Sequence, residues 1–457
     1  MLKGMVAPMK HTAIEMDVVY GIEDKPGLSK GIILAFQHIL AMFAANITVP
    51  LLLSSLLGLP SSETTFLIQC SLFMAGVATF IQIAKYKGIG SGLPIVMGTS
   101  NAFIPTVLAI GKDFGIGAIL GASFIGGLFE VFLGKSLIKL KKIFTPLVSG
   151  IVVLTIGITL IPIGMREAAG IKTGSGSLIN LFISTSVLVT IILFNRSKNK
   201  FLKSSSILIG LVVGYVMSFF LGIVNMTPVI ETGWFAAPVP FQYKWSFEPA
   251  AIIAMLFMYI ATSIETIGDI SALTMGAEKR PATYEEMSGG VVADGIGSSI
   301  AALFNGFPNT SYTQNIGVVN LTGVFSRYVV KIGGIILIVL SIFPKFAALI
   351  AIMPEPVLGG ASMAMFPMVV VSGISLLKDV KLDSRNMLII AMSLGLGVGL
   401  NLVPEATQQL PRDIQFFLTS GVVPAAFVAI SLNLFFKDDI FDDDESNEEH
   451  IYSSQVR

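Results

Sequence analysis

The sequence predicts an all-α polytopic membrane protein with 14 transmembrane segments. First, 53% of its 457 residues are apolar and only 13% are charged, about half the charged fraction of a soluble domain. Second, apolar stretches of about 20 residues, the length of one helical crossing, recur with short polar breaks. Third, Lys and Arg gather in alternate loops, which the positive-inside rule requires of a correct segmentation.

The 14 segments follow the apolar stretches in order. We expect them near residues 31–57, 63–84, 94–110, 114–134, 145–165, 177–194, 204–225, 250–270, 288–305, 310–323, 329–344, 346–371, 386–403 and 414–436. Most of the 29 Lys and Arg residues then lie on one side of the membrane, together with both chain ends. The N- and C-termini are therefore predicted to be cytoplasmic.

The segments divide into two halves, 31–225 and 250–436. Because seven is an odd number, the second half starts on the opposite side of the membrane, and two similar halves would form an inverted repeat. A charged leader, residues 1–30, has no apolar core of a signal peptide. The acidic tail, residues 437–457, is expected to be solvated and has no assigned role.

The composition excludes several other kinds of function. The 29 basic and 29 acidic residues cancel, so the net charge attracts no nucleic acid. Cys70 is the single cysteine, which excludes an intrachain disulfide. With only three histidines in addition, the sequence predicts no metal site and no cofactor.

The third and tenth segments depart from the pattern of a plain helix. Residues 88–105 (GIGSGLPIVMGTSNAFIP) and 305–317 (NGFPNTSYTQNIG) place Gly, Pro and polar residues at membrane depth. Pro94 and Pro308 predict extended backbone before them, and short helices are expected after Thr99 and Thr313. Such backbone survives only inside protein or beside a water-filled cavity, so we expect both segments at the centre, their helix N-termini facing a polar ligand. The alternative is two ordinary kinked helices.

Acidic residues inside the predicted segments are the second indication of function. Glu265 and Asp269 lie four residues apart, on one face of the eighth segment, and Asp294 lies in the ninth. Glu265 is mid-segment and no neighbouring span contains a basic residue, which favours a functional role. For Asp269 the alternative to a functional role is that it lies near the cytoplasmic end of the eighth segment and is hydrated there.

Two further titratable residues have structural interpretations that involve no function. His38, in the first segment, is either functional or a helix-contact histidine bonded to a backbone carbonyl. Glu130 is five residues from Lys135, and we expect it to be a solvated or snorkelling residue at a helix end.

Carboxyls without basic partners at the midplane indicate neutralisation by a proton, which becomes a natural co-substrate. The amides Gln314, Asn315 and Asn101 add donors and acceptors but no basic anchor. A small, planar, neutral or weakly acidic heterocycle fits this set. Phe103 and Tyr312 are positioned to stack on such a ring, although packing is the commoner role of aromatic residues.

Several motifs in order carry a family resemblance. They are Gln37-His38 before ILAMF, GSGLPIVMGTSNAFI at 90–104, Glu265 with Gly268 and Asp269, Asp294, and Gln314-Asn315-Ile316-Gly317 followed by Thr322. From about residue 28 to 436 the sequence resembles the nucleobase/ascorbate transporter family, which includes bacterial uracil, xanthine and urate permeases.

The resemblance implies a homodimer in the bacterial plasma membrane. Each protomer would have a core domain of segments 1–4 and 8–11 and a gate domain of segments 5–7 and 12–14. A short β-strand would precede the helix in segments 3 and 10.

The same resemblance assigns roles to the site residues. The substrate contacts would be Glu265, which accepts from ring N–H groups, with Gln314, Asn101, Phe103, Tyr312 and Thr313. The structural or proton-coupling residues would be Asp294, His38, Asn315 and Asp269, and the proton-linked role would be shared by Glu265 and Asp294.

The resemblance also orders the substrates. Uracil-type members have Glu where this sequence has Gln314, whereas xanthine and urate members have Gln. Asn101 is also xanthine-type, but Tyr312 and Thr313 resemble the uracil type nearly as well. We therefore expect proton symport of xanthine first, urate next and uracil third.

Two rivals come from other classes. A sulfate-carrier-type anion transporter is disfavoured because the Glu265 carboxylate would repel anions. An intramembrane aspartyl protease is disfavoured because Asp269 and Asp294 lack the Gly-x-Gly-Asp and Tyr-Asp contexts of such enzymes. The sequence therefore predicts a transporter and not an enzyme.

Overall fold

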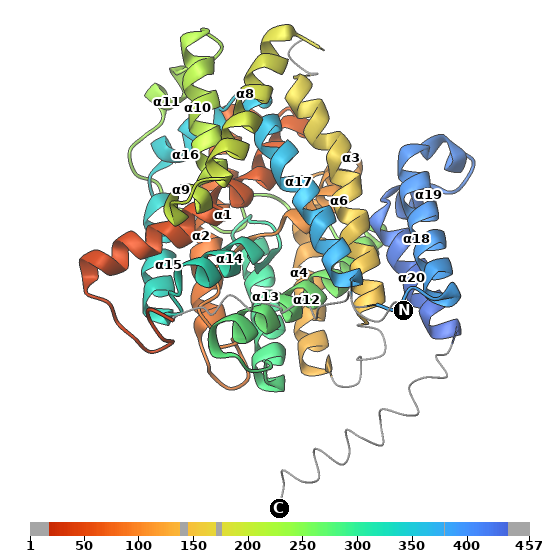
Figure 1. The fold of residues 1–457 in the computed structure, drawn as a ribbon. Coiled ribbons are helices and arrows are strands. Elements are labelled where there is room, and N and C mark those ends of the chain that lie inside the picture. The colour runs from red at the N-terminus through yellow and green to blue at the C-terminus, as the bar shows by residue number, and fades with distance from the viewer. Residues whose placement is uncertain (1–17, 138–144, 171–175, 379, 437–457) are drawn as a thin grey trace, which may run out of the picture.

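The structure is a computed structural model that describes residues 18–137, 145–170, 176–378 and 380–436. The acidic tail predicted to be solvated lies outside these residues. The described chain is mostly helical, and its helices form one bundle around buried central elements (Figure 1).

Eight described helices are long and apolar enough to cross a membrane. They are α1 (Leu28–Leu57), α2 (Ser61–Ile83), α4 (Ile116–Lys135), α6 (Pro146–Ala169), α8 (Leu178–Asn195), α12 (Pro249–Glu278), α17 (Glu355–Leu377) and α18 (Ser384–Leu402). A ninth candidate is the pair α15 (Arg327–Ser341) and α16 (Pro344–Ala351), which is bent by 82°. The count of 14 crossings stays a prediction.

The remaining described elements are shorter or less apolar. They are α3 (Ile104–Phe114), α9 (Lys200–Ser204), α10 (Ser206–Phe220), α11 (Thr227–Glu231), α13 (Tyr284–Leu303), α14 (Thr313–Thr322), α19 (Arg412–Thr419), α20 (Val422–Phe435), the 3₁₀ turns η1 (Asn101–Phe103) and η2 (Pro404–Thr407), and two strands described below. Helices α10, α13 and α14 match predicted segments to within a few residues, α3 and α20 begin well inside theirs, and α11 and η2 lie in predicted loops.

Two predicted segments are each divided in the structure. The expected helix 346–371 is α16 followed by α17, because Pro354 is in an extended conformation at the start of α17. The expected helix 414–436 is α19 followed by α20, separated at Gly421, whose φ of 75° favours glycine.

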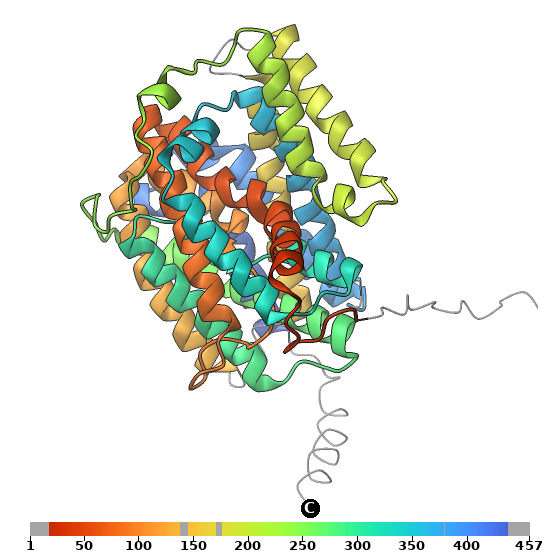
Figure 2. The same ribbon diagram turned by 90° about the vertical axis from the view of Figure 1, so that its left-hand side faces the viewer.

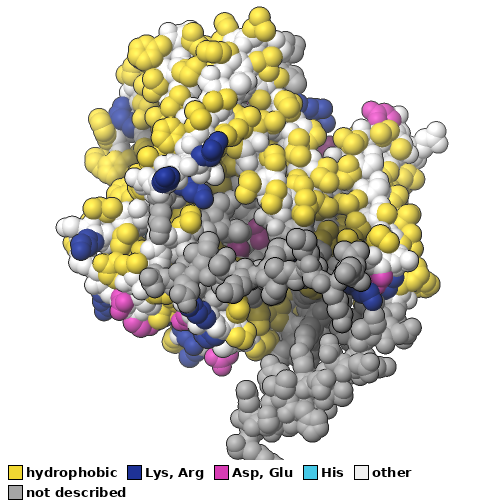
Figure 3. Space-filling model, in the orientation of Figure 1, with side chains coloured by type: hydrophobic (Ala, Val, Ile, Leu, Met, Phe, Trp, Pro, Cys, Tyr) yellow, Lys and Arg dark blue, Asp and Glu magenta, His cyan; other side chains and the backbone are white. Residues whose placement is uncertain are grey.

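Apolar side chains cover much of the outer surface (Figure 3). On α8 and α10 they include Leu178, Phe182, Leu193, Phe219 and Phe220, each more than half exposed. A soluble monomer rarely exposes so much apolar surface. These helices therefore present a surface suited to lipid.

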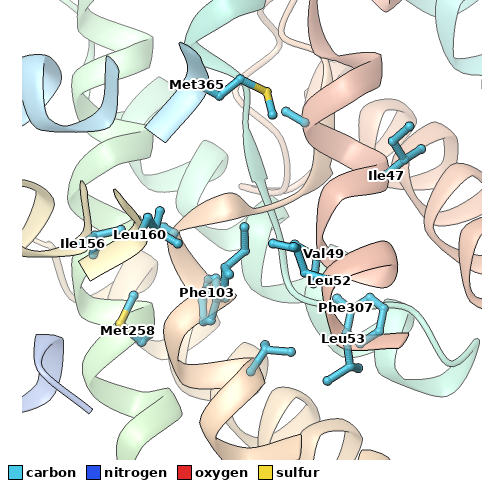
Figure 4. Close-up of a cluster of buried hydrophobic side chains, with 14 of the residues drawn as sticks. Ile47, Val49, Leu52, Leu53, Phe103, Ile156, Leu160, Met258, Phe307 and Met365 are labelled. Carbon is cyan, nitrogen blue, oxygen red and sulfur yellow. The ribbon is translucent and has the colours of Figure 1, made fainter. Parts of the chain in front are cut away.

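The central helices pack through small residues. At the contact between α4 and α13, a Cβ on Gly295 would lie 2.5 Å from the carbonyl oxygen of Gly127. No larger side chain fits without separating the helices. Figure 4 shows the neighbouring apolar core, where Phe103 lies among side chains of α1, α6, α12 and α17. The interrupted third segment is therefore anchored in the centre of the bundle.

Candidate functional site at the two interrupted segments

The two interrupted segments meet as a buried two-stranded sheet. Strand β1 (Met97–Thr99) pairs antiparallel with β2 (Asn309–Ser311), with Gly98 opposite Thr310. Both strands follow Pro94 and Pro308, whereas extended backbone was predicted before these prolines; a strand preceding the helix in each segment is what the family resemblance implied. Short helices follow each strand, η1 with α3 after β1 and α14 after β2. The helix N-termini therefore start from one central pair of strands, which two ordinary kinked helices would not produce.

Neighbouring side chains satisfy the outer edges of this small sheet. On β1, Asn46 Oδ1 accepts from Thr99 N at 2.8 Å, and Thr79 Oγ1 accepts from Met97 N at 3.0 Å. On β2, Ser298 Oγ accepts from the backbone N–H of Asn309 at 2.9 Å. Buried N–H groups without partners would each cost about 1–3 kcal/mol. Helices α1, α2 and α13 therefore hold the strands in place.

Asn315 and His38 form part of the same framework. Asn315 Oδ1 accepts from Val96 N at 3.0 Å, and its Nδ2 lies 2.6 Å from His38 Nδ1. Because the amide nitrogen can only donate, His38 Nδ1 accepts and the imidazole is neutral. Both side chains are at most 1% exposed. The contact partner of His38 is thus a side-chain amide, and not the backbone carbonyl considered above.

Asp269 connects α12 to the second interrupted segment. Its carboxylate accepts from Ser311 Oγ at 2.6 Å and from Thr313 Oγ1 at 2.8 Å. Only 5% of the residue is exposed, so the alternative of a hydrated residue at the helix end is wrong. Asp269 instead fixes β2 and the first residue of α14.

Asp294 is completely buried. Its Oδ2 accepts hydrogen bonds from the hydroxyls of Thr266 on α12 and Thr310 on β2. Its Oδ1 has no hydrogen-bond partner among the described residues. Asp294 therefore joins α12, α13 and β2, and no salt bridge within the described residues involves it.

The predicted aromatic contacts are engaged in packing in this conformation. Phe103 is 0% exposed and meets the ring of Tyr259 edge-on, with 4.8 Å between centroids. Tyr312 is 4% exposed and donates its hydroxyl to the carbonyl of Thr99 at 2.5 Å. Neither ring presents a free face for stacking here.

Three polar side chains of the set are not engaged in this way. Gln314 is exposed at the start of α14, and Glu265 is half-buried on α12 with no hydrogen bond found within the described chain. Asn101 is half-buried at the start of η1, and its Oδ1 lacks a partner among the described residues. These groups are the ones available to a ligand.

Comparison with known proteins decides the family. A sequence model described as the permease family matches residues 29–406. The chain belongs to the nucleobase/ascorbate transporter family. Family members are permeases, so this nucleobase/ascorbate transporter is a multi-pass membrane protein and not an enzyme.

Relatives of this transporter include a xanthine permease and a uric acid permease. It is 36% identical over 439 residues to the xanthine permease XanP of Escherichia coli K12, covering 92% of this chain and 95% of XanP. It is 38% identical over 408 residues to the uric acid permease PucK of Bacillus subtilis 168, covering 88% of this chain and 95% of PucK.

A solved structure shows the fold. The transmembrane domain of the cyanobacterial bicarbonate transporter BicA aligns with a TM-score of 0.56 at 15% identity, covering 90% of this chain and 98% of that domain. The nucleobase/ascorbate transporter described here therefore shares the fold of that membrane transporter.

The structure contradicts the prediction made for Glu130 of this transporter. Glu130 is 0% exposed, and its Oε1 accepts from Thr262 Oγ1 at 3.3 Å and Ser263 Oγ at 3.2 Å, both on α12. The expectation of a solvated or snorkelling residue is therefore wrong. The signal was the spacing Gly127, Glu130 and Gly134, which places Glu130 on the small-residue face of α4 that packs against other helices.

Proposed function

We propose that the chain imports an oxidised purine, xanthine or urate, together with a proton by alternating access. Support comes from the xanthine and uric acid permeases among its relatives and from the amide at Gln314. A carboxamide both donates and accepts, which suits the adjacent carbonyl and N–H groups of an oxidised purine.

The observation that carries the proposal is that the three acidic residues differ in their hydrogen bonding. Asp269 and Asp294 are each occupied by hydroxyl donors, whereas Glu265 has no hydrogen bond within the described chain. Glu265 lies one helical turn from Asp269, which binds the first residue of α14, next to exposed Gln314. A carboxylate in this position accepts hydrogen bonds from ring N–H groups of the purine, while the Gln314 amide hydrogen-bonds to the neighbouring edge of the ring.

The proposed coupling ion is a proton. Glu265, Asp269 and Asp294 lie close together at the centre of the bundle, and within the described residues no salt bridge reaches them. A buried carboxyl without a cation is favoured in its neutral form. Proton binding at Glu265 or Asp294 would therefore accompany substrate binding.

The proposed architecture is a 14-segment inverted repeat with the predicted core and gate domains, working as a homodimer with cytoplasmic termini. Equivalent roles support the repeat. Thr79 on α2 accepts from an N–H of β1, and Ser298 on α13 accepts from an N–H of β2. The antiparallel pairing of β1 with β2 is what a twofold axis in the membrane plane would produce.

Transport by purified protein in liposomes tests the proposal. We expect labelled xanthine or urate to accumulate under an inward proton gradient, and a protonophore to abolish accumulation. Accumulation unaffected by the protonophore would remove the proton from the mechanism. Uracil accumulating in preference to either purine would favour the uracil permease, and proton-independent sulfate uptake would favour the anion transporter.

Two variants test the residues. Glu265→Gln should abolish binding, whereas Glu405→Gln, the same change at an exposed position, should leave it intact. Gln314→Glu should shift preference towards uracil. Unaltered affinity in Glu265→Gln, or unaltered preference in Gln314→Glu, would contradict the assigned roles.

A further inference from the structure

A cleft opens where the chain enters the helix bundle, away from the two interrupted segments. It has a volume of about 380 Å³ and lies between residues 22–25, the C-terminal end of α2 with the following turn, and the first turns of α15. In Figure 2 the dark red residues before α1 lie beside the lower ends of α2 and α15. We call this feature the basic cleft.

Hydrogen bonds fix the wall formed by the residues before α1. Phe325 N donates to Tyr20 O at 2.8 Å, and Arg327 N donates to Ile22 O at 3.1 Å. Ser326 Oγ donates to the carbonyl of Asp24 at 2.6 Å. The short stretch 20–24 is therefore bound along the start of α15, and the cleft has a defined shape.

The charge of the basic cleft is strongly positive. Its lining includes Lys25, Lys85, Arg327 and Lys331 but only one acid, Glu23. Glu23 forms a salt bridge with Arg327. No salt bridge found in the described chain involves the three lysines. Three positive charges thus converge on one cavity without compensation, which an anion would supply.

The remaining wall is apolar and aromatic. Phe80 and Ile83 come from the last turn of α2, and Tyr328 comes from the first turn of α15. Both helices belong to the membrane-embedded bundle. A small soluble anion has no apolar atoms that could pack against such a wall. A phospholipid, in contrast, places glycerol and acyl carbons next to its phosphate.

We propose that the basic cleft binds the phosphate of an anionic phospholipid headgroup. Its lysines lie on the side that the positive-inside pattern assigns to the cytoplasm, where the membrane surface is negative. Lys25, Lys85 and Lys331 contact the phosphate from the three walls of the cleft, and the lipid fastens the stretch before α1 to α2 and α15.

Native mass spectrometry of the full detergent-purified chain tests the proposal. The probes are dioctanoyl phosphatidylglycerol, dioctanoyl phosphatidylcholine and inorganic phosphate. The double variant Lys85→Gln/Lys331→Gln removes two cations of the cleft. Each lysine near an anionic lipid contributes about 1 kcal/mol, so its affinity for phosphatidylglycerol should fall about 30-fold.

The matched control is Lys135→Gln/Lys378→Gln, which removes two exposed lysines outside the cleft. It should bind phosphatidylglycerol like the unchanged chain, and Lys85→Arg/Lys331→Arg should retain the affinity because the charge is kept. Equal loss in the control pair, or equal binding of phosphatidylcholine, would overturn the proposal. Binding of inorganic phosphate as tight as that of phosphatidylglycerol would replace the lipid with a soluble phosphate.

Discussion

Gly98 is the position where a single methyl group should disturb the centre of the site most. A Cβ at Gly98 would lie 2.6 Å from Asn46 Oδ1, 2.7 Å from Tyr312 Cε2 and 2.8 Å from Met42 Cε. Ordinary contact begins at 3.4 Å, so Gly98→Ala requires shifts of roughly 0.6–0.8 Å on three sides. Overpacking of this kind typically costs about 1–3 kcal/mol.

The crowded atoms also hold β1. Asn46 Oδ1 accepts from the N–H of Thr99, and the Tyr312 hydroxyl donates to the carbonyl of Thr99. A shift that breaks either hydrogen bond adds about 0.5–1.5 kcal/mol to the loss. Gly98→Ala should therefore lower both the thermal stability and the xanthine affinity, since β1 leads into the first interrupted helix.

Thermal unfolding in detergent and xanthine binding measure the effect. Gly395→Ala on α18 is the control, because a Cβ there meets nothing within 4 Å. An alanine in an open helical position stabilises by about 1 kcal/mol, so this variant should unfold no earlier than the unchanged chain. If Gly98→Ala matched the control in both measurements, the close packing around β1 would not be needed for the site.

Three further changes should give distinct results in the same assays. Asn315→Leu leaves the Val96 N–H and His38 Nδ1 without partners, at about 1–3 kcal/mol each, and should lower the unfolding temperature clearly; an unchanged temperature would refute it. Glu130→Gln keeps an acceptor for the hydroxyls of α12 and should fold, whereas Glu130→Lys buries an unpaired charge and should yield no folded protein by size exclusion; folded Glu130→Lys would contradict the burial. Tyr312→Phe removes one hydrogen bond to β1, worth about 0.5–1.5 kcal/mol, and should destabilise less than Asn315→Leu; an equal or larger loss would show that the ranking is wrong.

Local backbone chemistry explains why the interrupted segments were predictable. Pro94 and Pro308 fix φ and lack an N–H donor, so they interrupt a regular helix and favour extended backbone at the residue before each of them. The strands Met97–Thr99 and Asn309–Ser311 begin three residues after Pro94 and one residue after Pro308, so the prolines indicated the interruptions but not the positions of the strands. Their pairing with each other was not predicted, because it depends on contacts between residues about 210 positions apart.

Side-chain burial was harder to predict from sequence. Glu130 was expected near solvent because Lys135 follows it, yet α4 turns its small-residue face, with Glu130 on it, towards α12 and α13. Phe103 was considered for stacking, but only the assembled bundle shows that Tyr259 covers its ring. Both facts depend on which helix faces meet, and hydrophobic periodicity is weak in helices that are apolar all round.

The distribution of hydrogen bonds indicates which parts of the site move together. Asp269 ties α12 to β2 and the start of α14, and Thr266, also on α12, ties it to Asp294 on α13. Glu265 lies on α12 directly before Thr266 and one turn before Asp269, and Gln314 directly follows Thr313, one of the residues that Asp269 binds. We therefore expect the distance between Glu265 and Gln314 to stay constant when the transporter changes conformation. Access to the substrate would then change through movement of other helices past this unit, because its own polar contacts are buried and would be costly to break.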